Sequence, residues 1–367
     1  MIPAEVDDLT ADWFTAVLRP RSPGVVVTGA EVIDAHSGTT GRARVRLEYA
    51  ESESDLPNTL FVKLAPFHPR QREFIRHVGI GVSEARLYAS LGDELPVRAP
   101  RVWHAAFAGD EFVMVLEDLV ASGCTFPRPS DDDVTDRARS TVEELALLHA
   151  AYWESARFSG DLGWVPERAG FGAGAGAGKD AGAAKAAGGF VRLALDRFAG
   201  EMPEAFRRVG TLYAERAADV LDLWDEGERT LIHGDPHMGN LFADGARTGF
   251  FDWAMVSRSP GMRDVAYFCC NSIPSGVRRE IEHELLDRYR QVLAARGVDL
   301  DAGSAFEQYR LFAVFSWVSA TSTAAMGDRW QPADVGRGGM ERATTAIADL
   351  DSVGLLEERL GTRSARA

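Results

Sequence analysis

The pattern of apolar and polar positions divides the sequence into two parts. Near the N-terminus, an amphipathic helix follows Thr10, which is suited to cap it. Short alternating or mostly apolar runs come next, with one helical segment over 83–91 among them. The predicted strands are residues 24–30, 42–50, 59–65, 101–107 and 111–116. This part of the chain is therefore predicted to form a small, strand-rich unit.

From about Asp132 the apolar positions recur with helical spacing. The predicted helices are residues 134–153, 190–198, 205–223, 278–295 and 305–325. Residues 169–189 interrupt this pattern with a run of glycine and alanine that has too little side-chain bulk to build a core. We therefore predict a helical C-terminal part with a flexible surface insertion at about 169–189.

Composition and charge narrow the classes of partner. The 367 residues are 46% hydrophobic and 26% charged, which suits a folded protein of two lobes with sizeable cores. A net charge of -15 opposes binding to nucleic acid and to anionic membranes, and it weakly favours a cationic or neutral small-molecule substrate. Three cysteines form no disulfide pattern, and acidic residues stand where a secretory signal would be basic. A cytoplasmic location is the expectation.

The segment 231–252, LIHGDPHMGNLFADGARTGFFD, carries the most specific chemistry. Asp235 can orient a hydroxyl and accept its proton, while Asn240 and Asp252 offer oxygen ligands to Mg²⁺. Apolar residues precede the polar loop and also precede Asp252, so the three side chains are predicted at the rim of one cleft. His233, Asp235 and His237 could alternatively ligate a transition metal, as in a hydrolase.

The same residues resemble a known family. His233-Gly234-Asp235 with Asn240, followed by Phe251-Asp252-Trp253, is similar to the catalytic loop and metal-binding motif of aminoglycoside phosphotransferases and choline kinase-like proteins. Glycine stands where the protein kinase motif has arginine, and Trp-Ala stands where it has Phe-Gly. The loop and the later RWQP segment, 329–332, resemble the ecdysteroid kinase-like branch more than dedicated antibiotic-resistance enzymes.

The resemblance implies a nucleotide site upstream. Lys63 lies in an apolar strand, where an unpaired ammonium is costly, so it needs an anion. The resemblance implies that this anion is the α/β-phosphate of ATP and that Glu84 holds the lysine, with Glu73 as a weaker rival. Gly38 and Gly41 lie between two predicted strands and would form a turn over the phosphates, although an ordinary hairpin has the same signal.

Three more positions follow from the resemblance or from periodicity. Residues 112–119 resemble the strand and hinge between kinase lobes, where the main chain near Glu117 and Leu119 would bind the adenine edge. Asp264 resembles a residue that supports the catalytic loop from the following helix, which is a structural role. His149 lies on an apolar helical stripe and is predicted to pack in the core.

Together these features predict an α+β, bilobal protein kinase-like fold. Residues 1–117 would form a nucleotide-binding lobe with a small mixed β-sheet, and residues 118–367 a mainly helical catalytic and substrate lobe. The predicted function is ATP- and Mg²⁺-dependent transfer of the γ-phosphoryl group to a hydroxyl of a small molecule. A metal-dependent hydrolase and a non-catalytic, kinase-like binding module are the alternatives.

Overall fold

The chain forms two compact units in the computed structural model, which describes residues 2–50, 56–78, 80–167, 181–327 and 333–364. Unit 1 comprises Met1–Thr125, Phe242–Gly245 and Gly249–Met255. Unit 2 comprises Phe126–Leu241, Ala246–Thr248 and Val256–Ala367. The contacts of unit 1 thus extend past residue 117 and include two later segments, while the division into domains at residue 117 stays a prediction.

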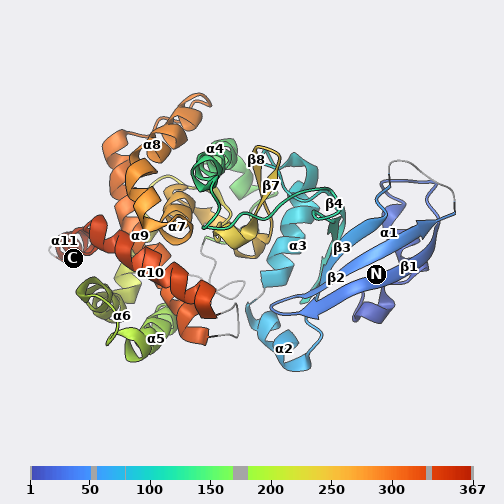
Figure 1. The fold of residues 1–367 in the computed structure, drawn as a ribbon, viewed down its shortest axis with the longest axis horizontal. Coiled ribbons are helices and arrows are strands. Elements are labelled where there is room, and N and C mark those ends of the chain that lie inside the picture. The colour runs from blue at the N-terminus through green and yellow to red at the C-terminus, as the bar shows by residue number, and fades with distance from the viewer. Residues whose placement is uncertain (1, 51–55, 79, 168–180, 328–332, 365–367) are drawn as a thin grey trace. The chain divides into compact units, whose positions relative to one another are not determined.

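A five-stranded sheet with the order β1-β2-β3-β5-β4 is the centre of unit 1 (Figure 1). All four strand pairs are antiparallel, so the prediction of a mixed sheet was wrong in this respect. The physical reason is the short connections within β1-β2 and β4-β5, which join antiparallel neighbours as hairpins. The strands are β1 (Val27–Ser37), β2 (Gly41–Tyr49), β3 (Thr59–Leu64), β4 (Val102–Ala108) and β5 (Glu111–Glu117).

The helices of unit 1 cover this sheet. Helix α1 (Ala11–Leu18) begins as predicted, because the Thr10 hydroxyl accepts the Trp13 N–H at 3.2 Å. Helix α3 (Ile80–Leu91) packs against β4 and β5. Helix α2 (Pro69–Val78), which precedes it, was not predicted, because its sequence PRQREFIRHV has few apolar positions with helical spacing.

Unit 2 is mainly helical, as predicted. Helix α9 is its central element and packs against α5, α7, α10 and α11, with Trp317 fully buried along it. The helices are α4 (Val134–Tyr152), α5 (Ala181–Phe198), α6 (Glu204–Trp224), α7 (Met262–Ser272), α8 (Ser275–Ala294), α9 (Ala302–Met326), α10 (Ala333–Asp349) and α11 (Ser352–Ser364). No helix in the described ranges is both long and apolar enough to span a membrane.

Helices α10 and α11 were not predicted. Glycines within α10 lower its helix propensity, so the sequence did not predict a helix here. Packing explains one of them: a Cβ at Gly339 would lie 2.6 Å from Asn271 Oδ1 on α7, so only glycine allows this approach. Tertiary contact therefore outweighs local propensity here.

Short strands flank the loop that begins at His233. Strand β6 (Thr230–Ile232) pairs with β9 (Ser257–Ser259) in unit 2 and ends directly before His233. Strands β7 (Leu241–Asp244) and β8 (Arg247–Phe250) form a second two-stranded sheet. Apolar residues of β6 precede the polar loop and those of β8 precede Asp252, as predicted, and two strands lie between Asp235 and Asp252.

The predicted insertion at 169–189 needs a correction. Residues 169–180 lie outside the described residues, but Ala181–Gly189 form the first half of α5. Alanine has the highest helix propensity, and Ala184 is buried, so this alanine-rich run continues the predicted helix toward the N-terminus. A low side-chain volume indicated flexibility where it instead permits close helix packing against α6.

Replacing Gly189 with alanine should stabilise the protein by about 0.5–1 kcal/mol, because alanine loses less backbone entropy than glycine in a helix. The position is exposed, and an added Cβ meets no atom within 4 Å. Thermal or urea unfolding measures the change. Gly109→Ala is a control with the opposite sign, since Gly109 has a φ of 60° in a turn. An unchanged stability of the Gly189 variant would contradict the helical assignment.

Candidate active site

The loop that carries Asp235 is held by a buried carboxylate. Asp264, on α7, accepts the main-chain N–H of His233 at 2.7 Å and that of Gly234 at 2.9 Å. Gly234 has a φ of 85°, a left-handed conformation that disfavours a side chain. This backbone conformation explains why the HGD motif has glycine at this position. The loop-supporting position expected for Asp264 is thus present in the structure.

Two more buried side chains continue this network. His149 Nε2 lies 3.4 Å from Asp264 Oδ2, and His149 Nδ1 lies 2.9 Å from the Tyr289 hydroxyl. His149 is fully buried, as predicted, but it also contacts the residue that supports the loop. A Cβ at Gly261 would lie 2.4 Å from the Tyr289 hydroxyl and 2.6 Å from His149 Nδ1, so glycine is required there as well. Periodicity located the histidine in the core without revealing this contact.

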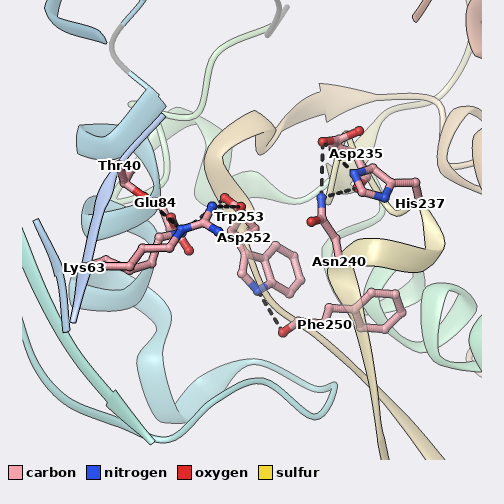
Figure 2. A network of polar contacts seen from close by, with 10 residues as sticks. Thr40, Lys63, Glu84, Asp235, His237, Asn240, Phe250, Asp252 and Trp253 are labelled. Carbon is pink, nitrogen blue, oxygen red and sulfur yellow. Dashed lines mark hydrogen bonds and ion pairs between the residues drawn. The ribbon is translucent and has the colours of Figure 1, made fainter. Parts of the chain in front are cut away.

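Asp235 and Asn240 are brought together by the loop (Figure 2). Asn240 Nδ2 donates to the Asp235 carbonyl at 2.9 Å and to Asp235 Oδ2 at 3.2 Å. The Asp235 side chain remains 31% exposed, which leaves it accessible to a small molecule, and His237 Nε2 lies 3.7 Å from it. The amide thus fixes the orientation of the carboxylate, while Asn240 Oδ1 points away from that hydrogen bond and can serve a cation.

Tyr267 is a site residue that the sequence analysis missed. Its side chain is buried on α7, and burial together with the neighbouring Asp235 carboxylate raises its pKa well above the ordinary value. The phenol therefore stays protonated and lies next to Asp235. Its position three residues after Asp264, in Asp264-Val-Ala-Tyr267, is the signal that could have indicated it, because residues three apart share a helix face.

Unit 1 contains the second set of predicted residues. Lys63 and Glu84 are both buried and form an ion pair, so Glu84, on α3, holds the lysine rather than the exposed Glu73 (Figure 2). Lys63 Nζ also lies 3.2 Å from Asp252 Oδ1. Burial raises the pKa of Glu84, and the positive charge of Lys63 opposes that rise. The ion pair expected from the apolar strand is confirmed, while the roles of its residues stay predictions.

Asp252 has an unusual backbone and a second cationic neighbour. Its φ is 62°, in the left-handed region that few non-glycine residues adopt. The following 3₁₀ helix η5 (Trp253–Met255) packs against α3, which holds the Asp252 carboxylate near Lys63. Arg42, on β2, contacts Asp252 Oδ2 at 3.5 Å. The alternation of β2 placed Arg42 on the polar face, but it could not show which carboxylate that face meets.

The glycine turn is formed between β1 and β2. A Cβ at Gly41 would lie 2.5 Å from Phe67 Cε1 and 2.6 Å from the Ala65 carbonyl, so close packing explains this glycine. A Cβ at Gly38 would meet no atom within 4 Å, so packing gives no reason for it. A role for either residue in phosphate binding stays a prediction.

The segment after β5 is fixed by ion pairs. Arg98 binds the Glu117 carboxylate at 2.8 Å, and Arg44 binds Asp118 at 2.8 Å. The Glu117 main-chain N–H already donates to the Arg101 carbonyl at 2.8 Å, and the Leu119 carbonyl accepts from Cys124. Among the main-chain groups predicted to bind adenine, the Glu117 N–H is therefore already used in a hydrogen bond within the protein. The contact with adenine stays a prediction.

The donor atoms suit a hard cation better than a transition metal. Asn240 Oδ1 and the Asp252 carboxylate are oxygen donors, which Mg²⁺ prefers. In the hydrolase alternative, His233 Nδ1 already accepts the Asp235 N–H at 3.3 Å, and His237 Nδ1 accepts the Gly239 N–H at 3.0 Å. Within the described ranges, no group of three or more His, Cys, Asp or Glu side chains could hold a metal ion.

Comparisons with known proteins identify the family to which the sequence is similar. The model of the ecdysteroid kinase-like family matches residues 36–300. A search of curated protein sequences found no match. The RWQP segment, which pointed to the same branch, lies outside the described residues.

Solved structures share the fold. A protein from Ralstonia eutropha JMP134 that is assigned to the aminoglycoside phosphotransferases is 13% identical, with a TM-score of 0.53, over 93% of this chain and 98% of its own. Plasmodium vivax ethanolamine kinase is 13% identical, with a TM-score of 0.53, over 93% and 86%. Choline kinase from Cryptosporidium parvum Iowa II is 11% identical, with a TM-score of 0.52, over 95% and 97%. The α+β, kinase-like fold predicted from the sequence is therefore confirmed.

The buried pair of unit 1 should show non-additive effects on stability. Lys63→Met should lower the free energy of unfolding by about 3–5 kcal/mol, because it leaves the buried Glu84 carboxylate without its partner. Glu84→Gln should lower it by less, because Asp252 remains beside the Lys63 ammonium. The double variant should lose clearly less than the sum of the two. Urea unfolding of all four proteins measures this, and strictly additive losses would show that the two residues act independently.

Proposed function

We propose that this chain, which belongs to the ecdysteroid kinase-like family, transfers the γ-phosphoryl group of ATP to a hydroxyl of a small molecule with the help of Mg²⁺. The observation that carries this proposal is the buried Lys63, which contacts both Glu84 and Asp252. A lysine held by one carboxylate and lying beside a second, partly exposed carboxylate is the arrangement that phosphoryl transfer requires for a metal-bound nucleotide. A purely structural ion pair would not need Asp252.

Each residue of unit 1 then has a proposed task. Lys63 donates to the nucleotide phosphates, and Glu84 limits the positions that its ammonium can adopt. Asp252 is proposed as a ligand of Mg²⁺, an assignment that the sequence motif extends to Asn240; the ion when bound would neutralise charge on the phosphates. Arg42 contacts Asp252 and supplies a second positive charge next to this carboxylate. The proposed cytoplasmic location agrees with a need for ATP.

Asp235 is proposed as the residue that accepts the acceptor proton. Its side chain is partly exposed, and Asn240 fixes its orientation from one side. Tyr267 lies next to it with a protonated phenol. Asp264 holds the loop backbone, so its contribution is to position Asp235 and not to touch the substrate.

Asp235→Asn should lower turnover by about 10²–10⁴-fold, because the amide cannot accept the hydroxyl proton. The affinity for ATP should change little, since Asp235 is assigned to the acceptor. Steady-state kinetics with an acceptor that the wild-type protein phosphorylates, combined with calorimetric titration of a non-hydrolysable ATP analogue, separates the two effects. Near wild-type turnover of the variant would refute the role of Asp235.

Asp252→Ala should weaken Mg²⁺-dependent nucleotide binding more than Asn240→Ala, because a carboxylate attracts the cation more strongly than an amide oxygen. Titration of the nucleotide analogue with and without Mg²⁺ measures the difference. Nucleotide binding that is equally tight without Mg²⁺ would contradict the assignment. Stoichiometric zinc that is lost on replacing His233 and His237 would support the hydrolase alternative instead.

A further inference from the structure

Arg263, on α7, is a buried cation that the proposed mechanism does not use. Its side chain is 8% exposed. In the described part of the chain its guanidinium makes neither a hydrogen bond nor an ion pair, and its Nε is buried without a partner. The Nε atoms of the two other buried arginines of the described ranges, Arg278 and Arg137, likewise make no hydrogen bond. Their terminal guanidinium nitrogens differ from those of Arg263, since Arg278 pairs with Glu282 and Asp349, and Arg137 donates to Thr248 and nearby carbonyls.

The surroundings of Arg263 only partly compensate its charge. The guanidinium carbon lies 3.9 Å from the centroid of the Phe315 ring on α9, a cation–π contact weaker than a buried ion pair. Asp264 is near, but both of its oxygens already accept N–H groups of the catalytic loop. Asp225 acts on Arg263 at longer range without forming an ion pair. The charge therefore remains incompletely neutralised.

Arg263 remains protonated at neutral pH. Burial lowers its pKa to about 10, which still lies well above physiological pH. A buried charge without a partner destabilises the folded state, and proteins retain such groups mainly where they have a function. The folded protein thus holds a positive charge that an anion from outside could neutralise.

Arg263 also lies close to the proposed acceptor site. It is four residues before Tyr267 on α7, so the two side chains share one helix face. Both side chains contact Phe315, which lies 5.8 Å from the Tyr267 ring and is itself only partly buried. Tyr267 in turn neighbours Asp235. Arg263 therefore lies on the same face of α7 as Tyr267, one helical turn away, and Tyr267 is the neighbour of the proposed base Asp235.

We propose that Arg263 binds an anionic group of the acceptor, so that the substrate is a hydroxylated small molecule that carries a carboxylate, sulfate or phosphate. This inference rests on the proposed function for the identity of the ligand as an acceptor. It differs from the weak preference for cationic or neutral substrates that the net charge of -15 indicates. The buried guanidinium determines the preferred charge of the ligand at this site, because the field of the surface charges is screened in water over about 10 Å.

The first test uses no ligand and no activity. Arg263→Met removes a charge that has no partner. The Tm of this variant should therefore be no lower than that of the wild type, and an increase of about 2 °C is expected. Arg278→Met is the matched control, because it removes a buried arginine with two carboxylate partners, and its Tm should fall by about 5 °C or more. If Arg263→Met is insoluble or is destabilised like the control, Arg263 is structural and the proposal is wrong.

The second test measures anion binding directly. Titration calorimetry with 4-hydroxybenzoate, 3-hydroxybutyrate, inorganic sulfate and inorganic phosphate should give binding that Arg263→Met weakens about 10- to 100-fold. The amides 4-hydroxybenzamide and 3-hydroxybutyramide should bind weakly to both proteins. Stronger binding of the hydroxy acids than of the inorganic anions would identify a carboxylate. Binding that Arg263→Met leaves unchanged would overturn the proposal.

The third test links the site to turnover. In an ATP-consumption screen of hydroxy acids and their amides, the anionic members should be the better acceptors, and Arg263→Met should raise their KM about 10- to 100-fold while leaving the KM for ATP unchanged. Arg296→Met, at an exposed arginine, is the control and should change neither value. Neutral acceptors that both proteins phosphorylate equally well would overturn the inference alone, whereas absence of any nucleotide binding would refute the proposed function.

Discussion

The burial of the Lys63 ammonium in an apolar strand is the constraint on which the arrangement of unit 1 depends. A buried charge is tolerated only with partners, and the strand itself supplies none. One partner, Glu84, comes from α3, which explains why that helix packs against the sheet. The other, Asp252, comes from a segment far along the chain, and Gly249–Met255 accordingly belong to unit 1.

Unit 2 depends on a corresponding buried carboxylate. Asp264 replaces water for two consecutive main-chain N–H groups at the end of β6, where the chain leaves its strand and turns at Gly234. His149 contacts Asp264 Oδ2, and Tyr289 contacts His149 in turn, so helices α4, α7 and α8 all contribute to the support of one loop. The position of Asp235 is therefore determined by buried polar contacts rather than by the loop sequence alone.

The sequence predicted the features that follow from local chemistry. The cap at Thr10 and the need of Lys63 for an anion are both present. The support of the loop by Asp264, which the family resemblance implied, is present as well. Long-range packing caused the failures. Helix α10 contains a glycine, Gly339, at a close approach to α7, and the alanine-rich start of α5 continues a helix that packs against α6.

The missed site residues have the same cause. Arg42 and Tyr267 occupy ordinary positions on a strand and on a helix, and only the fold brings each one to a carboxylate. Arg263 could not be noticed from the sequence at all, because what distinguishes it is the lack of a partner among the described residues. Residue type and spacing indicate the chemistry that is required, whereas the pairing of distant charges needs coordinates.

Mass-spectrometric detection of a phosphorylated product is the most direct test of the proposed phosphoryl transfer to a small-molecule hydroxyl. The purified protein is incubated with Mg²⁺, ATP labelled in the γ-phosphoryl group, and a panel of hydroxylated metabolites. The label should move to the hydroxyl of at least one small molecule, with one ADP formed for each product. ATP that remains intact with every compound, or label that appears only in inorganic phosphate, would contradict the proposal.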